Sequence, residues 1–310
     1  MITRKALRLG SVLRYSWKNL TYSFCIALAT YFMHIYFMDK NVSIPPSVVA
    51  ILGTALAIIM AFRNASAYDR WWGTRKHWAS IESESRTFTR QALTVVDPDH
   101  IPEELLNRSL QLVQGQLGWV NAMRLQLNGI TDPIEWKERV GVYFSKEDYD
   151  RISTRSNVVT QIGMLQGNAI KELNAEEVLD IYSYIQIDDT ITRLTDLQGD
   201  LEAIKDTPLP RPYDYYTRAF LAVFILFFPF GMIDTFWRLN APLLIVPVTM
   251  VVSWIFYQIY VFGTVMSQPF EFQTSVPMDY IVRKIEIDLK EIIGEKNIPD
   301  PVLEKAGVLT

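Results

Sequence analysis

The side chains most able to act on ions in this chain are carboxylates, and they gather in one stretch. Between Glu172 and Asp206 acidic residues recur throughout, against only Arg193 and Lys205. A solvated surface accounts for most of such runs, but carboxylates that line a water-filled path concentrate cations. Asp188 falls where an apolar stripe should continue, so it faces either a partner or water. We predict three acids beside an ion path: Asp180, Asp188 and Asp189.

Groups that hold metals or form covalent intermediates are scarce. The one cysteine, Cys25, cannot form a disulfide within the chain, and the histidines are too scattered for a zinc or haem site. Phosphate-binding, dinucleotide-binding, metalloprotease and serine-hydrolase motifs are absent from the sequence. We therefore expect no enzyme, no cofactor, no metal site and no nucleic-acid partner.

Readily charged residues within the apolar runs are limited to His34 and Asp234, both near the ends of their runs. Asp234 precedes Arg238 by four residues, which is ion-pair spacing on a helix. We favour an interfacial pair and an interfacial histidine over a proton relay at these positions. This scarcity of buried charge argues against a carrier of protons or charged solutes.

An apolar stripe marks the stretch from Ser47 to Phe62. Thr54, Ile58 and Phe62 recur every fourth residue and so lie along one side of a helix, with small residues beside them. Copies of this helix in a ring would form an apolar constriction. On spacing alone, ordinary helix packing remains the favoured explanation.

A cationic, aromatic strip follows without a linker, from Arg63 to Trp78. Arginines and aromatic residues are typical membrane-interface anchors. Their density here also suits a junction that couples a membrane helix to a water-exposed body. We predict this coupling role for Arg70, Trp71 and Trp72.

Composition and hydropathy predict the elements that position these residues. The 310 residues are 49% apolar and 21% charged, which is too polar for a pure membrane bundle. Apolar residues concentrate in long runs that approach the roughly 20 residues of a membrane span. The first run lacks a small-residue cleavage site, so we interpret it as retained rather than as a signal peptide. The expected spans are Leu20–Met38, Val48–Phe62, Ala219–Thr235 and Pro242–Met266.

Prolines and basic residues refine this arrangement. Pro229 and Pro247 predict kinks or breaks in the third and fourth spans. Basic residues flank the spans on one side, which predicts that both termini and the long middle segment are cytoplasmic. The expected regions are a basic cytoplasmic helix (1–19), spans one and two (20–67), a helical cytoplasmic domain (68–215), spans three and four (216–266) and a cytoplasmic C-terminal segment and tail (267–310).

The middle segment has helical patterns. Apolar residues recur at four-three spacing from Leu106 to Val120, and Ser145 precedes Asp148 as in a capping box. A long helix is predicted over Ala175–Ala203. One apolar stripe of this helix contains Val178, Ile181 and Ile185, and another, on roughly the opposite side, contains Ile187, Ile191, Leu194 and Leu201.

The stretch FRNASAYDRWWGTRKHW, from Phe62 to Trp78, resembles the signature of bacterial bestrophin-like proteins. LRLGSVLRYSWKNL near the N-terminus, the Gln268-Pro269-Phe270 turn and IEIDL at Ile285–Leu289 agree with this family. The resemblance implies an all-α membrane protein with four transmembrane helices and a helical cytoplasmic domain. It also implies a homopentamer around one central pore, with the second spanning helix lining a hydrophobic neck.

By position, that neck falls on Thr54, Ile58 and Phe62, where relatives carry a large apolar residue in place of Thr54. The family's second constriction, at the cytoplasmic exit, is placed near Ile181, Tyr182 and Ile185. Animal members bind calcium with an acidic cluster after the last span. A calcium site usually includes several carboxylates, whereas Glu271–Ser275 contains only that of Glu271. We therefore infer that calcium activation is absent.

The resulting hypothesis is a channel of the bacterial inner membrane that passes monovalent ions passively, with Na⁺ and K⁺ favoured over chloride. The resemblance to bacterial members implies the cation preference, and the acidic stretch favours it independently. A chloride channel of the same fold, a secondary transporter and a non-conducting membrane scaffold remain alternatives.

Overall fold

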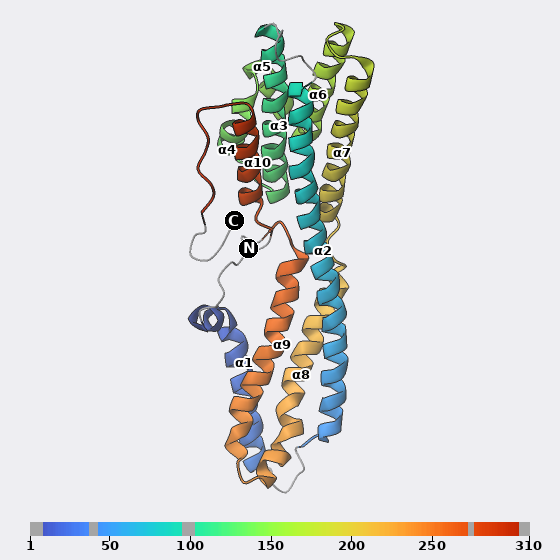
Figure 1. Cartoon of the computed structure of the whole chain (residues 1–310). Coiled ribbons are helices and arrows are strands. Elements are labelled where there is room, and N and C mark those ends of the chain that lie inside the picture. The colour runs from blue at the N-terminus through green and yellow to red at the C-terminus, as the bar shows by residue number, and fades with distance from the viewer. Residues whose placement is uncertain (1–8, 37–42, 95–102, 272–275, 304–310) are drawn as a thin grey trace. The chain divides into compact units, whose positions relative to one another are not determined.

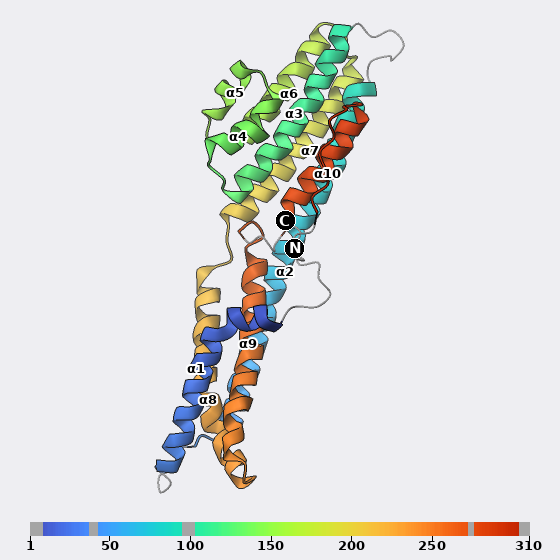
Figure 2. The same ribbon diagram turned by 90° about the vertical axis from the view of Figure 1, so that its left-hand side faces the viewer.

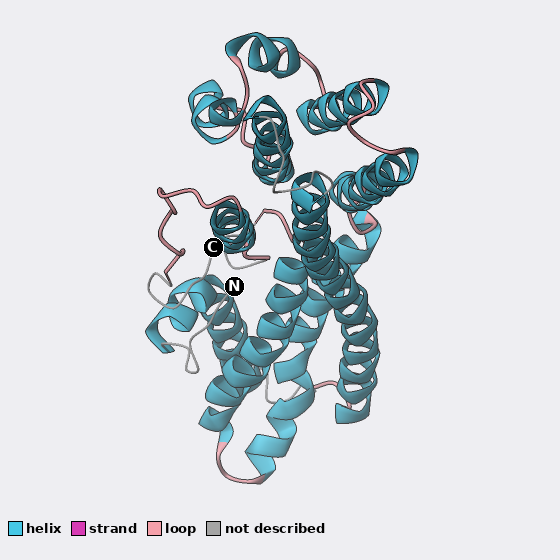
Figure 3. Ribbon diagram, turned by 45° about the horizontal axis from the view of Figure 1, so that its top comes forward, coloured by secondary structure: helices cyan, strands magenta, loops and turns pink. Residues whose placement is uncertain are grey.

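The computed structural model describes residues 9–36, 43–94, 103–271 and 276–303. Within these ranges the regular structure is helical, with no strand (Figure 3). Residues 1–8 of the predicted basic helix, the end of the predicted span Leu20–Met38 and most of Glu271–Ser275 lie outside these ranges. The elements are α1 (Leu9–Tyr36), α2 (Pro46–Thr94), α3 (Glu103–Asn128), α4 (Pro133–Arg139), η1 (Gly141–Tyr143), α5 (Lys146–Ser153), α6 (Val158–Ala175), α7 (Ile181–Asp206), α8 (Arg211–Arg238), η2 (Pro242–Leu244), α9 (Ile245–Ser267) and α10 (Met278–Ile292).

The chain divides into two compact units, and α2 contributes to both. The membrane unit contains α1, α2 as far as Trp71, and Pro208–Pro269 with α8 and α9 (Figure 1). The helical body contains α2 from Trp72, the helices α3 to α7, and α10 (Figure 2). Among the described residues, α2, the segment Pro212–Arg238 and the segment Pro242–Ser267 are long and apolar enough to cross a membrane.

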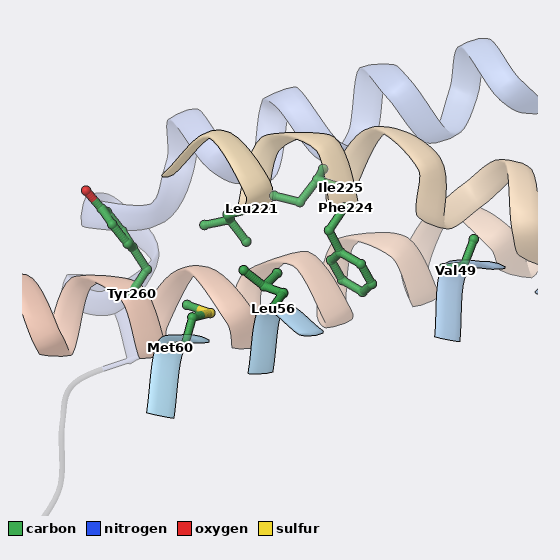
Figure 4. Close-up of a cluster of buried hydrophobic side chains, with 7 residues drawn as sticks. All are labelled: Val49, Leu56, Met60, Leu221, Phe224, Ile225 and Tyr260. Carbon is green, nitrogen blue, oxygen red and sulfur yellow. The ribbon is translucent and has the colours of Figure 1, made fainter. Parts of the chain in front are cut away.

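The core of the membrane unit forms where α2 packs against α8 and α9. Val49, Leu56 and Met60 recur on one side of α2 and are at most 4% exposed. Gly53 allows the Phe224 ring to approach α2, because a Cβ at Gly53 would lie 3.0 Å from that ring. The buried cluster, drawn in Figure 4, comprises Val49, Leu56, Met60, Leu221, Phe224, Ile225 and Tyr260.

The first helix packs along α9 through small and hydroxyl side chains. Ser23, Ala27 and Thr30 of α1 are at most 1% exposed, as are Thr249 and Ser253 of α9. Small side chains let helix backbones approach closely, which replaces hydrophobic burial as the basis of packing in a lipid environment. Helix α1 has 28 residues and contains Arg14 and Lys18 together with most of the first apolar run, and it is not among the three described helices that are apolar enough to cross a membrane.

The sequence predicted kinks or breaks at Pro229 and Pro247, and the structure shows no break at either proline. Helix α8 continues through Pro229. Pro247 is the third residue of α9, in the first turn, where a backbone N–H has no partner within the helix. Its missing donor therefore costs no hydrogen bond.

The body packs α3 against α6, α7 and α10. Val113, Leu117 and Val120 of the predicted stripe on α3 are buried, whereas Leu106 at its start is 42% exposed. The predicted cap is present, because the Ser145 side chain accepts a hydrogen bond from the Asp148 N–H at the start of α5.

Helix α10 is held to α2 by a charged cluster. Glu82 of α2, whose side chain is 9% exposed, lies 2.6 Å from both Arg86 and Lys284. Arg86 also pairs with Asp288 of α10. The body part of α2 thus carries a carboxylate between two cations.

The long helix predicted from Ala175 begins later, at Ile181. Glu177 adopts a positive φ of 60°, which ends the preceding helix. Asp180 then caps α7 by accepting hydrogen bonds from the Tyr182 and Ser183 N–H groups. Val178 is therefore not part of the helical stripe that contains Ile181 and Ile185, and the prediction was wrong on this point.

Candidate pore-lining site

The membrane part of α2 has an uncovered apolar side. Ile58 is 52% exposed and Phe62 is 65% exposed, and they share this side with Thr54. The exposed side chains point away from the buried face of Leu56 and Met60, since residues two apart on a helix lie about 200° apart. Ile51, 69% exposed and one helical turn before Thr54 and Ala55, extends the stripe and was not among the sequence predictions.

Thr54 places a hydroxyl on this apolar side, but the hydroxyl proton is engaged in a hydrogen bond within α2. The Thr54 Oγ1 donates a hydrogen bond to the Ala50 carbonyl oxygen at 2.9 Å. Such a bond to the preceding turn is a common way for Thr to satisfy itself in an apolar helix. The side chain therefore presents a methyl group and an acceptor oxygen, rather than a free donor.

An open groove of about 730 Å³ runs beside the stripe, between α2, α8 and α9. On α2 it is lined by small side chains, among them Gly53, Ala57 and Ala61. Phe224 and Phe228 of α8 line the other side. Small residues at this spacing leave room for another helix to approach α2 closely.

The predicted exit residues lie at the start of α7, in the body. Ile181, Tyr182 and Ile185 are 53%, 78% and 55% exposed. The opposite face of α7 is buried by Ile187 and Leu194. The helix thus has one covered face and one bare face, and the bare face carries the predicted residues.

The three predicted acids differ in their surroundings. Asp180 is committed to capping α7, and the Ser183 hydroxyl and the backbone N–H groups hold the pKa of its carboxyl below the ordinary value. Asp189 pairs with Arg193 one turn later. Asp188 is exposed beside Ile185 on the bare face of α7. Of the three, Asp188 has the placement that best suits an ion-facing carboxylate.

The predicted coupling residues lie where α2 passes from one unit to the other. Arg70 and Trp71 are half-buried, and Trp72 is 42% exposed. Within the membrane unit the Tyr68 and Trp71 rings lie 6.1 Å apart, and within the body Lys76 lies 5.7 Å from the Trp72 ring centroid. These contacts stay within α2, as expected for neighbours three or four residues apart on a helix.

The ionisable pair at the other end of the membrane unit differs from the predicted one. His34 Nδ1 lies 4.0 Å from an Asp234 oxygen, and the His34 ring lies 4.8 Å from the Trp237 ring. In the described part of the chain, the partner of Asp234 is therefore His34 of α1 and not Arg238.

Arg63, directly after Phe62, is a buried charge of the membrane unit with several hydrogen-bond partners. The side chain of Arg63 is 3% exposed. Its Nη2 donates to Asp214 Oδ1 at 2.6 Å and to Thr264 Oγ1 at 2.8 Å, and its Nη1 donates to the Tyr260 carbonyl oxygen at 3.1 Å. The guanidinium also lies 4.7 Å from the Tyr260 ring centroid.

Two further side chains complete this cluster. The Tyr260 hydroxyl donates to Asp214 at 3.1 Å, and Arg218 donates to the same carboxylate at 3.2 Å. From the sequence, Arg63 is an interface anchor. The structure instead buries Arg63 between α2, α8 and α9. The signal that could have indicated this is Asp214, an acid near the start of the third apolar segment.

These features define an all-helical membrane protein. Its second helix carries an uncovered apolar stripe, which is followed along the helix by a buried arginine cluster. A model of the bacterial and fungal bestrophin family matches residues 3–291. The chain therefore belongs to the bestrophin family, which confirms the resemblance seen in the sequence.

Similar proteins cover almost the whole chain. A protein of Ralstonia nicotianae named as voltage-dependent anion channel-forming is 26% identical over 304 residues, covering 97% of this chain and 94% of the relative. A protein of the same description from Escherichia coli K12 is 23% identical, covering 95% and 92%. The crystal structure of a bacterial bestrophin homologue from Klebsiella pneumoniae superposes with a TM-score of 0.81 at 20% identity, covering 90% of this chain and 98% of that one. This structural likeness confirms the all-helical fold.

Proposed function

We propose that this protein is a passive ion channel in which copies of α2 surround a hydrophobic neck of Thr54, Ile58 and Phe62. The observation that carries the proposal is the apolar stripe on α2, because more than half of the Ile58 and Phe62 side chains is uncovered in a single chain. Large exposed apolar side chains on one face indicate a surface that meets lipid, a partner or a pore. The names of the curated relatives favour the pore.

The assembly we propose is a homopentamer in the bacterial inner membrane, with four spans per subunit (α1, α2, α8 and α9) and both termini cytoplasmic. The groove beside the α2 stripe supports self-association, since its small side chains admit a neighbouring helix. Ile181, Tyr182 and Ile185 form a second constriction in this proposal, and Asp188 biases which ions reach it. Arg70, Trp71 and Trp72 couple the body to the neck.

For selectivity we propose that Na⁺ and K⁺ pass in preference to chloride, independently of calcium. The exposed Asp188 on the bare face of α7 supports a cation preference. A second candidate, an anion channel of the same fold, is favoured by the relatives' names. A scaffold or an ion-coupled transporter would not give the passive current that either channel predicts.

The deciding experiment is the reversal potential of purified protein in planar bilayers across a KCl or NaCl gradient, with and without a calcium chelator. A reversal potential near the cation equilibrium value supports the proposal, and one near the chloride value supports the anion channel. A current that vanishes on chelation contradicts calcium independence. No current with a folded oligomer contradicts the channel function itself.

A further inference from the structure

The inner end of the proposed neck places an exposed residue and a buried charge next to each other. Phe62 is 65% exposed, whereas the side chain of its neighbour Arg63 is 3% exposed. Adjacent residues of an α-helix point about 100° apart. Whatever fixes the direction of Arg63 therefore also fixes the direction of Phe62.

Arg63 has little freedom to move. Its guanidinium is held from α8 by the Asp214 carboxylate at 2.6 Å and from α9 by Thr264 and the Tyr260 carbonyl oxygen. A guanidinium removed from water is costly unless each such partner is kept. A rotation of α2 would break these bonds together, so the cluster opposes rotation.

The next residue adds a steric constraint from the same side. Asn64 Nδ2 donates to the Ile259 carbonyl oxygen at 3.0 Å. Opposite it, α9 has Gly263, and a Cβ there would lie 1.9 Å from Asn64 Oδ1 and 2.8 Å from Arg63 Nη1. The backbone of α9 thus approaches α2 at this point in a way that only glycine permits.

We propose that Arg63, held by Asp214 and seated against Gly263, is a positioning residue that sets the rotation of α2 and thereby aims Phe62 into the neck. This inference rests on the proposed channel function for its consequence, but its geometric content concerns only how α2 packs against α8 and α9 within one subunit. The Arg63 cluster then acts on conduction through Phe62, without touching the ion. An arginine that merely anchors the helix would leave the direction of Phe62 unchanged when its partner is altered.

Cysteine labelling tests the rotation without relying on current. In a Cys25→Ser background, Phe62→Cys places a thiol on the uncovered side of α2, and Met60→Cys places one on the side that is 2% exposed. A membrane-impermeant thiol reagent, applied to purified protein, should modify the first and spare the second. Adding Asp214→Asn should reduce this contrast, because the buried Arg63 guanidinium then loses its counter-charge, which is one of the contacts that fix the rotation of α2.

Matched controls separate rotation from general damage. Asp234→Asn alters another paired acid of α8, and Arg86→Gln alters a paired arginine in the body part of α2. Both should keep the labelling contrast. Gly263→Ala should abolish it by a steric route, which keeps the test open if Asp214→Asn fails to fold. Folded Asp214→Asn and Gly263→Ala variants that both retain the wild-type contrast would overturn the proposal.

Single-channel conductance of single and double variants tests the role of Arg63 separately from the proposed channel function. Asp214→Asn should change single-channel conductance when Phe62 is present and should have no further effect in a Phe62→Ala background, because coupled residues are not additive. If Phe62→Ala alone leaves conductance unchanged, the neck assignment is wrong. The labelling contrast still decides whether Arg63 positions α2. If instead the two effects add, the cluster does not act through Phe62.

Discussion

Substitutions at Leu56 and Ile58, which lie two positions apart on α2, should separate an effect on protein stability from an effect on ion conduction. Leu56 is 2% exposed and belongs to the core shared with α8 and α9, whereas Ile58 is 52% exposed on the uncovered side. Substitution by alanine removes the same number of carbon atoms from each. The two variants therefore differ in where the atoms are lost and not in how many.

The expected costs follow from these environments. Leu56→Ala leaves a cavity between three helices, and large-to-small changes at such sites cost about 2–5 kcal/mol. Ile58→Ala leaves no enclosed cavity and removes a side chain that is only half covered. Since full burial of such a side chain is worth about 1.5–3 kcal/mol, the loss here is about 1 kcal/mol.

Conduction should respond in the opposite order. Ile58→Ala widens the apolar ring once per subunit, so single-channel conductance rises. Leu56→Ala faces away from the ring and leaves the conductance of the folded channel near the wild-type value. The measurements are single-channel recording in planar bilayers and thermal unfolding of the purified protein. A Leu56→Ala conductance that rises as much as that of Ile58→Ala would refute the assignment of the two faces.

Two further predictions concern groups whose partners the structure defines. Burial alone would raise the pKa of Glu82, but hydrogen bonds from Lys284 and Arg86 outweigh it and lower that pKa. The stabilisation is then complete above about pH 4.3, the unfolded value, and is lost as pH falls through the lower folded pKa. Because both cations are nearly half exposed, Glu82→Gln should cost about 2 kcal/mol, between exposed and buried pairs. Unfolding of Glu82→Gln should depend less on pH in this acidic range than that of the wild type, and equal slopes would contradict this role. Thr54→Val should lower single-channel conductance by less than Ile58→Ala raises it, because only an acceptor oxygen is lost from the stripe. The measurement is the same bilayer recording. A larger fall in conductance would show that the Thr54 hydroxyl contacts ions.

The helical fold could be predicted because its signals are local. Apolar runs indicate spanning helices, and the fourfold spacing of Thr54, Ile58 and Phe62 groups them on one side of α2. The start of α7 could not be predicted in the same way. The sequence stays compatible with a helix through Glu176 and Glu177, and the break depends on a positive φ at Glu177 and on Asp180 as a cap.

The α1 interface was missed for a different reason. Its buried residues, including Ser23 and Thr30, are polar or small and lack an apolar pattern. Helix α1 packs along α9, whose buried Thr249 and Ser253 are also small and polar, and this packing joins segments more than 200 residues apart in the sequence. Pairing of this kind becomes visible only when the two helices are placed side by side.

The burial of Arg63 could not be predicted either, because it depends on a residue far away in the sequence. It also links the apolar stripe of α2 to the arginine cluster. A basic residue after an apolar run is an interface anchor in most membrane helices. Here Asp214, 151 residues away, removes Arg63 from the surface. A helix that must bury Arg63 and expose Phe62 has a narrow range of rotations, because the two directions differ by about 100°. The buried ion pair thus supplies what an exposed apolar stripe lacks, which is a contact within the same subunit that fixes where the stripe points.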